Sequence, residues 1–309
     1  MHKQIGYIGL GKMGEAQVLR LLEKGWKVVA YNRSPEPRLR IAQAGAQAVD
    51  SIQSLVSSLP APRVIWIMTS HQAVGEILGT LVPLLQKGDT IIEGGNSPYQ
   101  ETVRRAREIE DKGIGFIDCG VSGGPGGARA GACCMIGGRK ELVSSFEELW
   151  SDLSLPHGWA HLGPSGAGHF VKMTHNGIEY GMMQAIAEGF DLLRHSKEFP
   201  DLDMLQITEL YQHGSVVTSR LVGWLRDAFA KFGVALPEIS GKASASGEGG
   251  WTVEAGKRES ISMPIIEGSL VVRTQTQVRP SFQGKVLSAM RGEFGHHPVK
   301  RQHDGLPVL

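Results

Sequence analysis

The stretch QIGYIGLGKMGEAQVLRLLEKG, residues 4–25, decides the fold of this chain. Its first six residues form a short, largely apolar run that predicts a buried strand, and EAQVLRLLEKG has the spacing of an amphipathic helix. The run WKVVAYNRS at 26–34 then predicts a second strand. A G-x-G-x-x-G turn stands between the first strand and the helix. This arrangement is typical of the βαβ unit that binds a dinucleotide.

The three glycines of this turn have separate physical roles. Gly9 permits the tight turn, Gly11 lets a pyrophosphate approach the backbone, and Gly14 lets the helix pack closely on the strand. The first amides of the helix are donors for the phosphates. Met13, in the same turn, is also expected to contact the cofactor. The sequence therefore predicts a dinucleotide site at this turn.

The end of the second strand indicates which dinucleotide binds. NAD-binding chains usually carry Asp or Glu there, and its carboxylate accepts a hydrogen bond from the ribose 2′-hydroxyl. This chain has Asn32, Arg33 and Ser34 instead. A guanidinium can pair with a 2′-phosphate, and the amide and hydroxyl can hydrogen-bond to it. We expect NADP as the cofactor, with NAD as the alternative. The alternative without a role in binding is that Arg33 is only a solvated loop residue.

Strands and helices continue to alternate through the first half of the chain. Further strands are predicted at 64–70, 89–97, 114–124 and 133–138, with helices at 75–88 and 99–113. Such alternation is typical of a parallel, doubly wound α/β sheet. Strand patterns stop at residue 163. We therefore expect a Rossmann-type α/β domain at 1–163 and an all-helical C-terminal domain at 164–309, used for substrate binding and dimerisation.

The carboxyl ends of the predicted strands carry candidate binding residues. In doubly wound sheets, ligands bind in the crevice outside these ends. Met68, Asn96 and Ser122 each stand at or just after such an end. Gly123 and Gly124 follow Ser122 and expose backbone amides without bulky side chains. We expect Met68 and Asn96 to contact the cofactor, and Asn96, Ser122 and the two glycines to cradle a polyhydroxylated substrate.

One long helix is predicted within GPSGAGHFVKMTHNGIEYGMMQAIAEGFDLLRHS, residues 163–196. A mixed polar stripe runs along one of its faces, where an apolar stripe would be normal for a buried helix. The stripe consists of Lys172, His175, Asn176, Glu179 and Tyr180. A solvated face is the alternative reading, but it would favour Lys, Glu and Arg. Gly177 and Gly181 interrupt the helix, which suits close approach by a ligand or a second helix.

The composition is that of a soluble globular protein. Of 309 residues, 41% are hydrophobic, and 32 Lys and Arg balance 31 Asp and Glu. Without a basic run, a nucleic-acid surface is not expected. No segment has the roughly 18 apolar residues of a membrane span, and no signal-peptide pattern is visible. The cysteines lack metal spacing, and so do the histidines near residue 300. We expect a cytoplasmic protein without a metal.

Several motifs together resemble a known family. GLGKMG, the D-x-x-x-SGG of 118–124 and the G-x-G-x-x-x-K-x-x-x-N of 166–176 are similar to those of the β-hydroxyacid dehydrogenases. HNGIEYG, EGGNS and GEGGWT narrow the resemblance to the decarboxylating 6-phosphogluconate dehydrogenases. The resemblance covers essentially the whole chain. The length of this sequence, 309 residues, is similar to that of the short form of that family.

The resemblance implies roles for the polar stripe. Lys172 would be the general base that takes the proton of the substrate's 3-hydroxyl, and Glu179 would be the acid that protonates C1 of the enediol formed by loss of CO2. Lysine suits this role if burial near the cationic nicotinamide lowers its pKa. His175 and Asn176 would orient the hydroxyls and Lys172, and Tyr180 would hold the phosphate.

The resemblance also implies cations for the phosphate. Arg273 matches the family's phosphate-binding arginine, and RGEFGHH at 291–297 resembles the tail that crosses into the neighbouring subunit's site. Arg291 and His297 would then contact the phosphate or the sugar. This would make the protein a homodimer or homotetramer whose C-terminal tail completes the neighbouring site. Each arginine taken alone would more often be a surface residue.

The sequence departs from the long form of the family at two lysines. Ser246 and Gly250 stand where the long form carries lysine, so fewer cations are expected to line the cleft. The resemblance implies NADP-dependent oxidative decarboxylation of 6-phosphogluconate. A non-decarboxylating 3-hydroxy acid dehydrogenase of the 3-hydroxyisobutyrate type is the nearest rival, since it shares Lys172 and Asn176. A catalytically silent NADP-sensing protein is the rival from another class.

Overall fold

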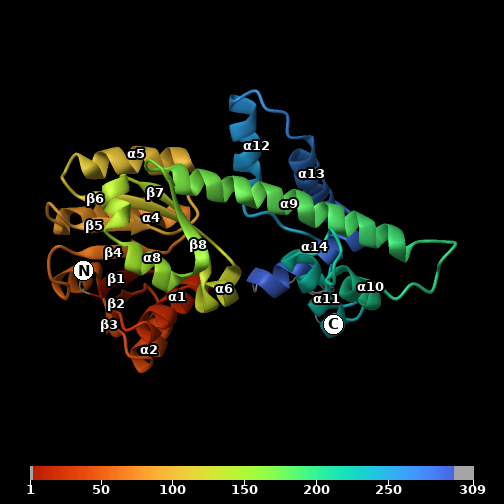
Figure 1. Cartoon of the computed structure of the whole chain (residues 1–309), viewed down its shortest axis with the longest axis horizontal. Coiled ribbons are helices and arrows are strands. Elements are labelled where there is room, and N and C mark those ends of the chain that lie inside the picture. The colour runs from red at the N-terminus through yellow and green to blue at the C-terminus, as the bar shows by residue number, and fades with distance from the viewer. Residues whose placement is uncertain (1–2, 296–309) are drawn as a thin grey trace, which may run out of the picture. The chain divides into compact units, whose positions relative to one another are not determined.

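The computed structural model describes residues 3–295, and the chain divides into two compact units, Met1–Met173 and Thr174–Leu309. The strands of the first unit are β1 (Gln4–Ile8), β2 (Lys27–Tyr31), β3 (Gln47–Val49), β4 (Val64–Ile67), β5 (Thr90–Glu93), β6 (Gly115–Ser122), β7 (Ala132–Gly138) and β8 (Ser154–Gly163). Its helices are α1 (Lys12–Glu23), α2 (Pro35–Gln43), α3 (Ile52–Ser57), α4 (His71–Leu81), the 3-10 turn η1 (Val82–Leu84), α5 (Tyr99–Glu110), α6 (Gly124–Ala130), α7 (Lys140–Ser144) and α8 (Glu147–Leu153). Strands and helices alternate along most of this unit, except that η1 follows α4 directly and α8 follows α7 (Figure 1).

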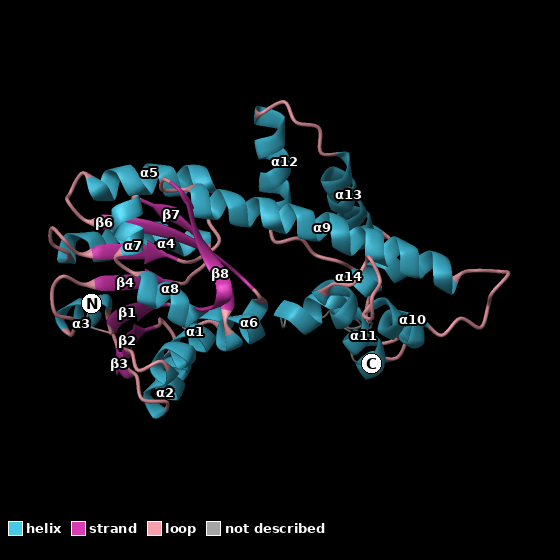
Figure 2. Ribbon diagram, viewed as in Figure 1, coloured by secondary structure: helices cyan, strands magenta, loops and turns pink. Residues whose placement is uncertain are grey.

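The eight strands form one sheet in the order β3-β2-β1-β4-β5-β6-β7-β8 (Figure 2). The strands from β3 to β6 in this order are all parallel. The order reverses at β1, which pairs with β2 on one side and β4 on the other. Such a reversal is the topological switch point where doubly wound sheets bind dinucleotides. The predicted α/β class is confirmed.

Both faces of the sheet are covered by helices. Trp66 and Ile117 point to one face and pack in a core cluster with residues of α1 and α8. Ile65 and Phe116 point to the other face and pack with residues of α3, α4 and α5. Neighbouring residues of one strand face opposite sides, so a strand buried on both faces reads as a continuous apolar run. VIWI and TIIE are such runs.

The sheet differs from the expected all-parallel arrangement at β7. This strand runs antiparallel to β6, with Ser122 opposite Cys133. Only α6 and two flanking residues join the two strands, whereas a parallel crossover needs a dozen residues or more. The strand β8 was not predicted, because SLPHGWAHLG lacks an apolar run. In the structure, only its first residue is buried, and the others are half-buried or exposed. It nevertheless pairs parallel to β7.

The second unit is helical. Its elements are the C-terminal part of α9 (Ala167–Arg194), α10 (Met204–Tyr211), α11 (Arg220–Phe232), α12 (Glu248–Arg258), α13 (Pro264–Val278) and α14 (Phe282–Gly295). The core of this unit gathers residues of α9, α10, α11 and α14, such as Met183, Leu225 and Leu287. The single long helix predicted within 163–196 is confirmed as α9, which begins in the first unit. Within residues 3–295, no helix is long and apolar enough to cross a bilayer.

Gly177 in α9 lies against a second helix. A Cβ atom at this position would come 2.6 Å from Cγ2 of Thr252 in α12. The reciprocal contact is made by Gly249 of α12, whose Cβ would lie 2.8 Å from the Tyr180 ring. By contrast, a Cβ at Gly189 of α9 would meet no atom within 4 Å. The interruption at Gly177 therefore follows from close packing of α9 and α12.

Gly177 and Gly189, both in α9, give a matched pair for measuring how tightly α9 packs on α12. We expect Gly177→Ala to lower the free energy of unfolding by about 1–3 kcal/mol, because the added methyl group overpacks the contact with Thr252. Gly189→Ala should raise it by up to about 1 kcal/mol, because alanine is the better helix former and the site is open. Denaturant unfolding of the full chain measures both values. Equal effects of the two substitutions would contradict the packing assigned to Gly177.

Candidate active site

The glycine turn between β1 and α1 has the geometry of a dinucleotide cradle. Gly9 has a φ of 101°, and a Cβ there would lie 2.3 Å from the carbonyl oxygen of Met68. A Cβ at Gly14 would lie 2.0 Å from the carbonyl oxygen of Gly9, so helix and turn are in direct contact. A Cβ at Gly11 would meet no atom within 4 Å. Gly9 and Gly14 thus close the turn, and Gly11 leaves open the space that a pyrophosphate needs.

The side chain of Asn32 is engaged in holding this turn. Its Oδ1 accepts a hydrogen bond from the amide of Leu10 at 2.9 Å, and its Nδ2 donates to the carbonyl of Ser34 at 3.2 Å. The amide group predicted to bind a 2′-phosphate is therefore used within the protein. Arg33 and Ser34 are exposed at the end of β2. Of the three predicted residues, these two remain the candidates for a 2′-phosphate.

Lys172 packs on strand β6 of the sheet and is only 7% exposed. A Cβ at Gly120 of β6 would come 2.3 Å from the Cβ of Lys172, so the lysine stem lies directly on the strand backbone. Its charge also reaches Cys133, which pairs with Ser122. Burial raises the pKa of the Cys133 thiol, and the Lys172 ammonium opposes that rise. The structure therefore brings Lys172 to the strand end that carries Ser122.

The other predicted strand-end residues lie where the topology requires. Met68 follows β4, and its amide donates to the carbonyl of Ile8 at 2.7 Å. Asn96 is exposed in the loop after β5. Gly123 and Gly124 follow Ser122 with φ values of 123° and 64°, in the region that favours glycine.

The loop that carries Asn96 is pinned by a buried ion pair that the sequence analysis missed. Arg105 of α5 donates to the Glu93 carboxylate at 3.1 Å and to the Ser97 hydroxyl at 3.3 Å. The Ser97 hydroxyl also donates to Glu93. Glu93 is fully buried. The sequence contained one sign of this ion pair: the apolar run TIIE ends in a carboxylate. A charge buried in a strand requires partners, so a nearby cation could have been expected.

The remaining residues of the polar stripe belong to the second unit. His175 Nδ1 lies 3.0 Å from the Asn176 side-chain oxygen and 3.9 Å from the Glu179 carboxylate. Asn176 and Tyr180 are buried, and His175 and Glu179 are half-buried. Lys172 and Asn176 are one helical turn apart on the continuous helix α9. The stripe therefore is not a solvated face.

Tyr180 is part of a cationic cluster. The guanidinium of Arg273, in α13, stacks over the Tyr180 ring at 3.9 Å and is 2% exposed. The Tyr180 hydroxyl accepts a hydrogen bond from the amide of Ser246 at 3.0 Å. Both Arg273 and Arg291, which is 8% exposed, donate to the carbonyl oxygen of Ser244, at 2.9 and 2.5 Å. Ser244 also accepts a hydrogen bond from Arg291 through its hydroxyl, at 2.6 Å. No motif singled out Ser244, because the contact that it shares between the two arginines is made by its backbone carbonyl.

This cluster has an excess of buried positive charge. Within residues 3–295, neither Arg273 nor Arg291 forms an ion pair with a carboxylate, and Nε of Arg273 is buried without a hydrogen-bond partner. Burial, with the Arg291 guanidinium nearby, lowers the pKa of Arg273 to about 10. Two buried guanidinium groups on one carbonyl offer donors that suit an anion with several oxygens.

The expected tail contact is placed only in part. Arg291 lies in α14 and contacts Ser244 of its own chain. His297 lies outside the described residues. The crossing of the tail into a neighbouring subunit therefore stays a prediction.

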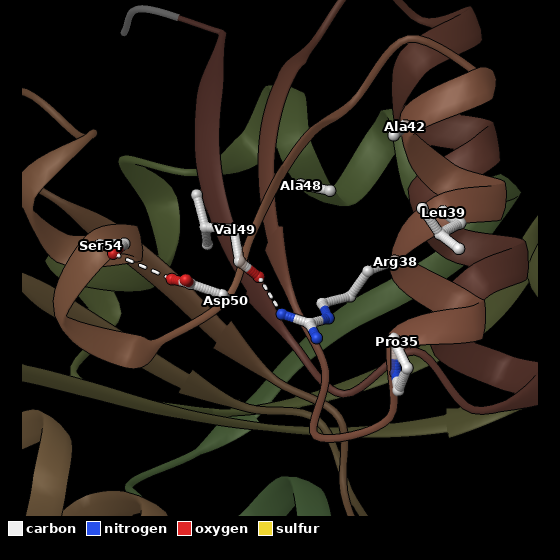
Figure 3. A pocket seen from close by; sticks show the side chains of 8 residues that line it. All are labelled: Pro35, Arg38, Leu39, Ala42, Ala48, Val49, Asp50 and Ser54. Carbon is white, nitrogen blue, oxygen red and sulfur yellow. Dashed lines mark hydrogen bonds between the residues drawn. The ribbon is translucent and has the colours of Figure 1, made fainter.

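A pocket of about 440 Å³ lies elsewhere in the first unit, between α2 and β3 (Figure 3). Arg38 donates to the carbonyl of Val49 at 3.3 Å, and Ser54 donates to the Asp50 carboxylate at 3.3 Å. The lining residues are Pro35, Arg38, Leu39, Ala42, Ala48, Val49, Asp50 and Ser54. None of these eight is a predicted site residue. The chemistry is therefore assigned from the strand ends and α9 rather than from this pocket.

A glycine cradle at a topological switch point and a buried lysine at the same sheet define the class as an NAD(P)-dependent oxidoreductase. Comparison with family models agrees. Residues 4–155 match the NAD binding domain of 6-phosphogluconate dehydrogenase, and residues 168–281 match its C-terminal domain. The chain belongs to the 6-phosphogluconate dehydrogenase family.

Two relatives match over their whole length. One is YqeC of Bacillus subtilis, provisionally named a 6-phosphogluconate dehydrogenase, with 41% identity over 97% of this chain and 100% of that protein. The other is the NAD(+)-dependent, decarboxylating 6-phosphogluconate dehydrogenase of Haloferax volcanii, with 37% identity and the same coverage. The human decarboxylating enzyme is 35% identical, and the match spans 64% of its length. The predicted short form is confirmed by these lengths.

Solved structures share the fold. The 6-phosphogluconate dehydrogenase of Plasmodium falciparum superposes with a TM-score of 0.82 at 29% identity, covering 89% of this chain and 62% of that one. The 3-hydroxyisobutyrate dehydrogenase of Mycobacterium tuberculosis has a TM-score of 0.71 at 18% identity, covering 93% and 98% of the two chains. The second likeness concerns the fold alone.

The cationic cluster predicts stabilisation by inorganic phosphate. We expect phosphate to raise the melting temperature of the protein over chloride at equal ionic strength, because a bound anion offsets the repulsion between Arg273 and Arg291. Arg273 stays cationic below its pKa of about 10, so the effect should fade as the pH rises through that value. Thermal unfolding of the full chain measures the shift.

Two substitutions control this measurement. Arg273→Met should remove most of the shift, whereas Arg258→Met should keep it, because the Arg258 side chain is 54% exposed and lies outside the cluster. An equal phosphate shift in both variants would show that the cluster does not bind the anion.

Proposed function

We propose that this protein oxidises 6-phosphogluconate and decarboxylates the product to ribulose 5-phosphate and CO2. The observation that carries the substrate assignment is the buried pair of Arg273 and Arg291 on the Ser244 carbonyl, with Arg273 stacked on Tyr180. A dianionic phosphate matches this excess of positive charge. A phosphate-free 3-hydroxy acid would leave both guanidinium groups buried without an ion-pair partner, with only the Glu179 carboxylate acting on Arg273 from beyond ion-pair distance, which is unfavourable.

The first step assigns a base to Lys172. Bound NADP or NAD would supply the acceptor for the hydride that leaves C3 of the substrate. Lys172, neutral at the start of the step, takes the proton of the 3-hydroxyl as that hydride leaves. Its stem is held against Gly120, so only its amine end can move toward the substrate. The product of this step is a 3-keto acid.

The next two steps use the proton that Lys172 has gained. The 3-keto acid breaks its C1–C2 bond, CO2 leaves from C1, and the electron pair forms an enediol. The Lys172 ammonium donates its proton to the carbonyl oxygen at C3 and becomes neutral again. Glu179 then protonates the carbon that held the carboxylate, which is C1 of the enediol, while the neutral Lys172 amine takes back the proton of the C3 hydroxyl, so that the ketone forms. His175 lies between Asn176 and Glu179 and orients the hydroxyls with them.

A direct assay tests this proposal. We expect 6-phosphogluconate to reduce the nicotinamide cofactor with release of one CO2 per reduction, and Lys172→Met to abolish reduction while cofactor affinity stays unchanged. Absorbance of the reduced cofactor and trapped CO2 measure the two products.

The outcomes separate the rivals. Reduction with 3-hydroxyisobutyrate, and none with 6-phosphogluconate, would replace the proposal with the non-decarboxylating dehydrogenase. Cofactor binding without turnover of either acid would leave the silent NADP-sensing protein. Unchanged turnover in Lys172→Met would remove that lysine from the mechanism.

For the cofactor, we propose a preference for NADP. The support is the absence of a carboxylate in the sequence at the end of β2 and the exposed Arg33 there. We expect Arg33→Asp to shift the ratio of kcat/KM values toward NAD by about tenfold or more, because a carboxylate repels a 2′-phosphate and accepts from a 2′-hydroxyl. Steady-state kinetics with both cofactors measure the ratio. A parent enzyme that already prefers NAD would overturn the proposed preference; the Haloferax relative is named NAD(+)-dependent.

The assembly is the last part of the proposal. We propose a cytoplasmic homodimer or homotetramer in which the tail with His297 completes the neighbouring site. Light scattering of the purified chain tests the assembly, and full turnover by a monomer would exclude it.

A further inference from the structure

We propose that Asp118 is a positioning residue, which fixes the register of α9 on β6 and thereby places Lys172. Asp118 is fully buried in the middle of β6. Its Oδ1 accepts a hydrogen bond from the amide of Gly166 at 2.6 Å, and its Oδ2 accepts one from the amide of His169 at 2.8 Å. Both amides belong to the start of α9, although they are 48 and 51 residues away in the chain.

This contact is a helix cap supplied from a strand. The first amides of a helix lack partners within the helix, and a carboxylate there is favoured by the helix dipole. A local cap would leave the helix free to slide on the sheet. Asp118 instead ties the first turn of α9 to one residue of β6. The position of the helix along the strand is therefore fixed by this carboxylate.

Glycines bring the helix and the sheet into direct contact at the same place. A Cβ at Gly168 would lie 2.4 Å from the carbonyl oxygen of Met135 in β7 and 2.9 Å from that of Asp118. A Cβ at Gly137 of β7 would lie 2.5 Å from Oδ1 of Asp118. Neither site accepts a side chain, so the first turn of α9 rests on the backbone of both strands.

The spacing of the contacts extends this register to Lys172. Gly168 lies at Asp118, and Lys172 lies at Gly120. Four helical residues advance about 6 Å, and two strand residues advance about 6.6 Å, so the two contacts are in step. Alternate strand residues share a face, which puts Asp118, Gly120 and Ser122 in one line beneath α9. The carboxylate at one end of that line sets where the lysine stands relative to the serine at the other.

A second contact ties the same turn to α5. His169 Nδ1 lies 2.8 Å from the hydroxyl of Thr102, and both residues are buried. The backbone amide of His169 is held by Asp118, and its ring is held by Thr102. His169 stands one helical turn before Lys172, so the turn that leads to the lysine is held at two points.

This inference rests on the proposed role of Lys172 as base, and the experiment has one readout that does not. We expect Asp118→Asn to lower kcat by about tenfold or more while KM for 6-phosphogluconate changes little, because a misplaced base costs the chemical step rather than binding. The primary isotope effect with substrate deuterated at C3 should rise. Independently of turnover, amide hydrogen exchange at 164–173 should become faster in the full chain.

Asp89 provides the matched control. It is also fully buried, and its carboxylate also accepts hydrogen bonds from two backbone amides, those of Arg63 at 2.7 Å and Gln86 at 2.9 Å. It stands just before β5, at the amino end of that strand and therefore away from the strand ends that carry Asn96 and Ser122. Asp89→Asn should lower the melting temperature without changing kcat per folded molecule or exchange at 164–173. Equal loss of kcat in both variants would reduce Asp118 to a stabilising residue and overturn the proposal.

Thr102 supplies a second test if Asp118→Asn does not fold. Thr102→Val removes the hydroxyl that holds His169, and Thr102→Ser keeps it. A lower kcat and faster exchange at 164–173 in the valine variant alone would support positioning through this turn, whereas equal values in both would overturn it. If the parent enzyme does not turn over 6-phosphogluconate, the proposed function fails, and the exchange measurements still decide whether the anchor exists.

Discussion

The capping of α9 by Asp118 is the contact on which the proposed chemistry of the first unit depends. One carboxylate in β6 accepts both amides at the helix start, and the helix then carries Lys172 along the strand to Gly120. A buried carboxylate is stable only with such partners. The same residue therefore supports the fold and, as we propose, determines where Lys172, the proposed base, lies. Because the strand also ends at Ser122, the base and a substrate-contact candidate share one rigid support.

In the second unit, buried charge is the corresponding constraint. Arg273 and Arg291 converge on the carbonyl of Ser244, and the pKa of Arg273 falls to about 10 as a result of burial and this proximity. A fold that only needed stability would replace such a pair with apolar residues. Retaining it is favourable when an anion binds there. The stacking of Arg273 on Tyr180 holds the guanidinium in a fixed plane, which suits the proposed recognition of a phosphate.

Several of the sequence interpretations needed the structure to refine them. Asn32 was assigned to a 2′-phosphate, but its amide holds the turn at Leu10, which leaves Arg33 and Ser34 for that role. The direction of β7 followed from the short connection through α6 and was not visible in the run CCMIGG. Gly177 was correctly read as a point of close approach, and the structure identifies Thr252 as its neighbour.

The sequence by itself determined the features that depend on neighbours along the chain. The G-x-G-x-x-G turn follows from spacing within one βαβ unit, and the polar stripe of α9 follows from the 3.6-residue period of one helix. Only the tertiary structure decided the contacts between distant segments. Asp118 with the start of α9, His169 with Thr102, and two arginines on the Ser244 carbonyl are such contacts. Their partners are set by strand order and helix packing, and no local spacing encodes these.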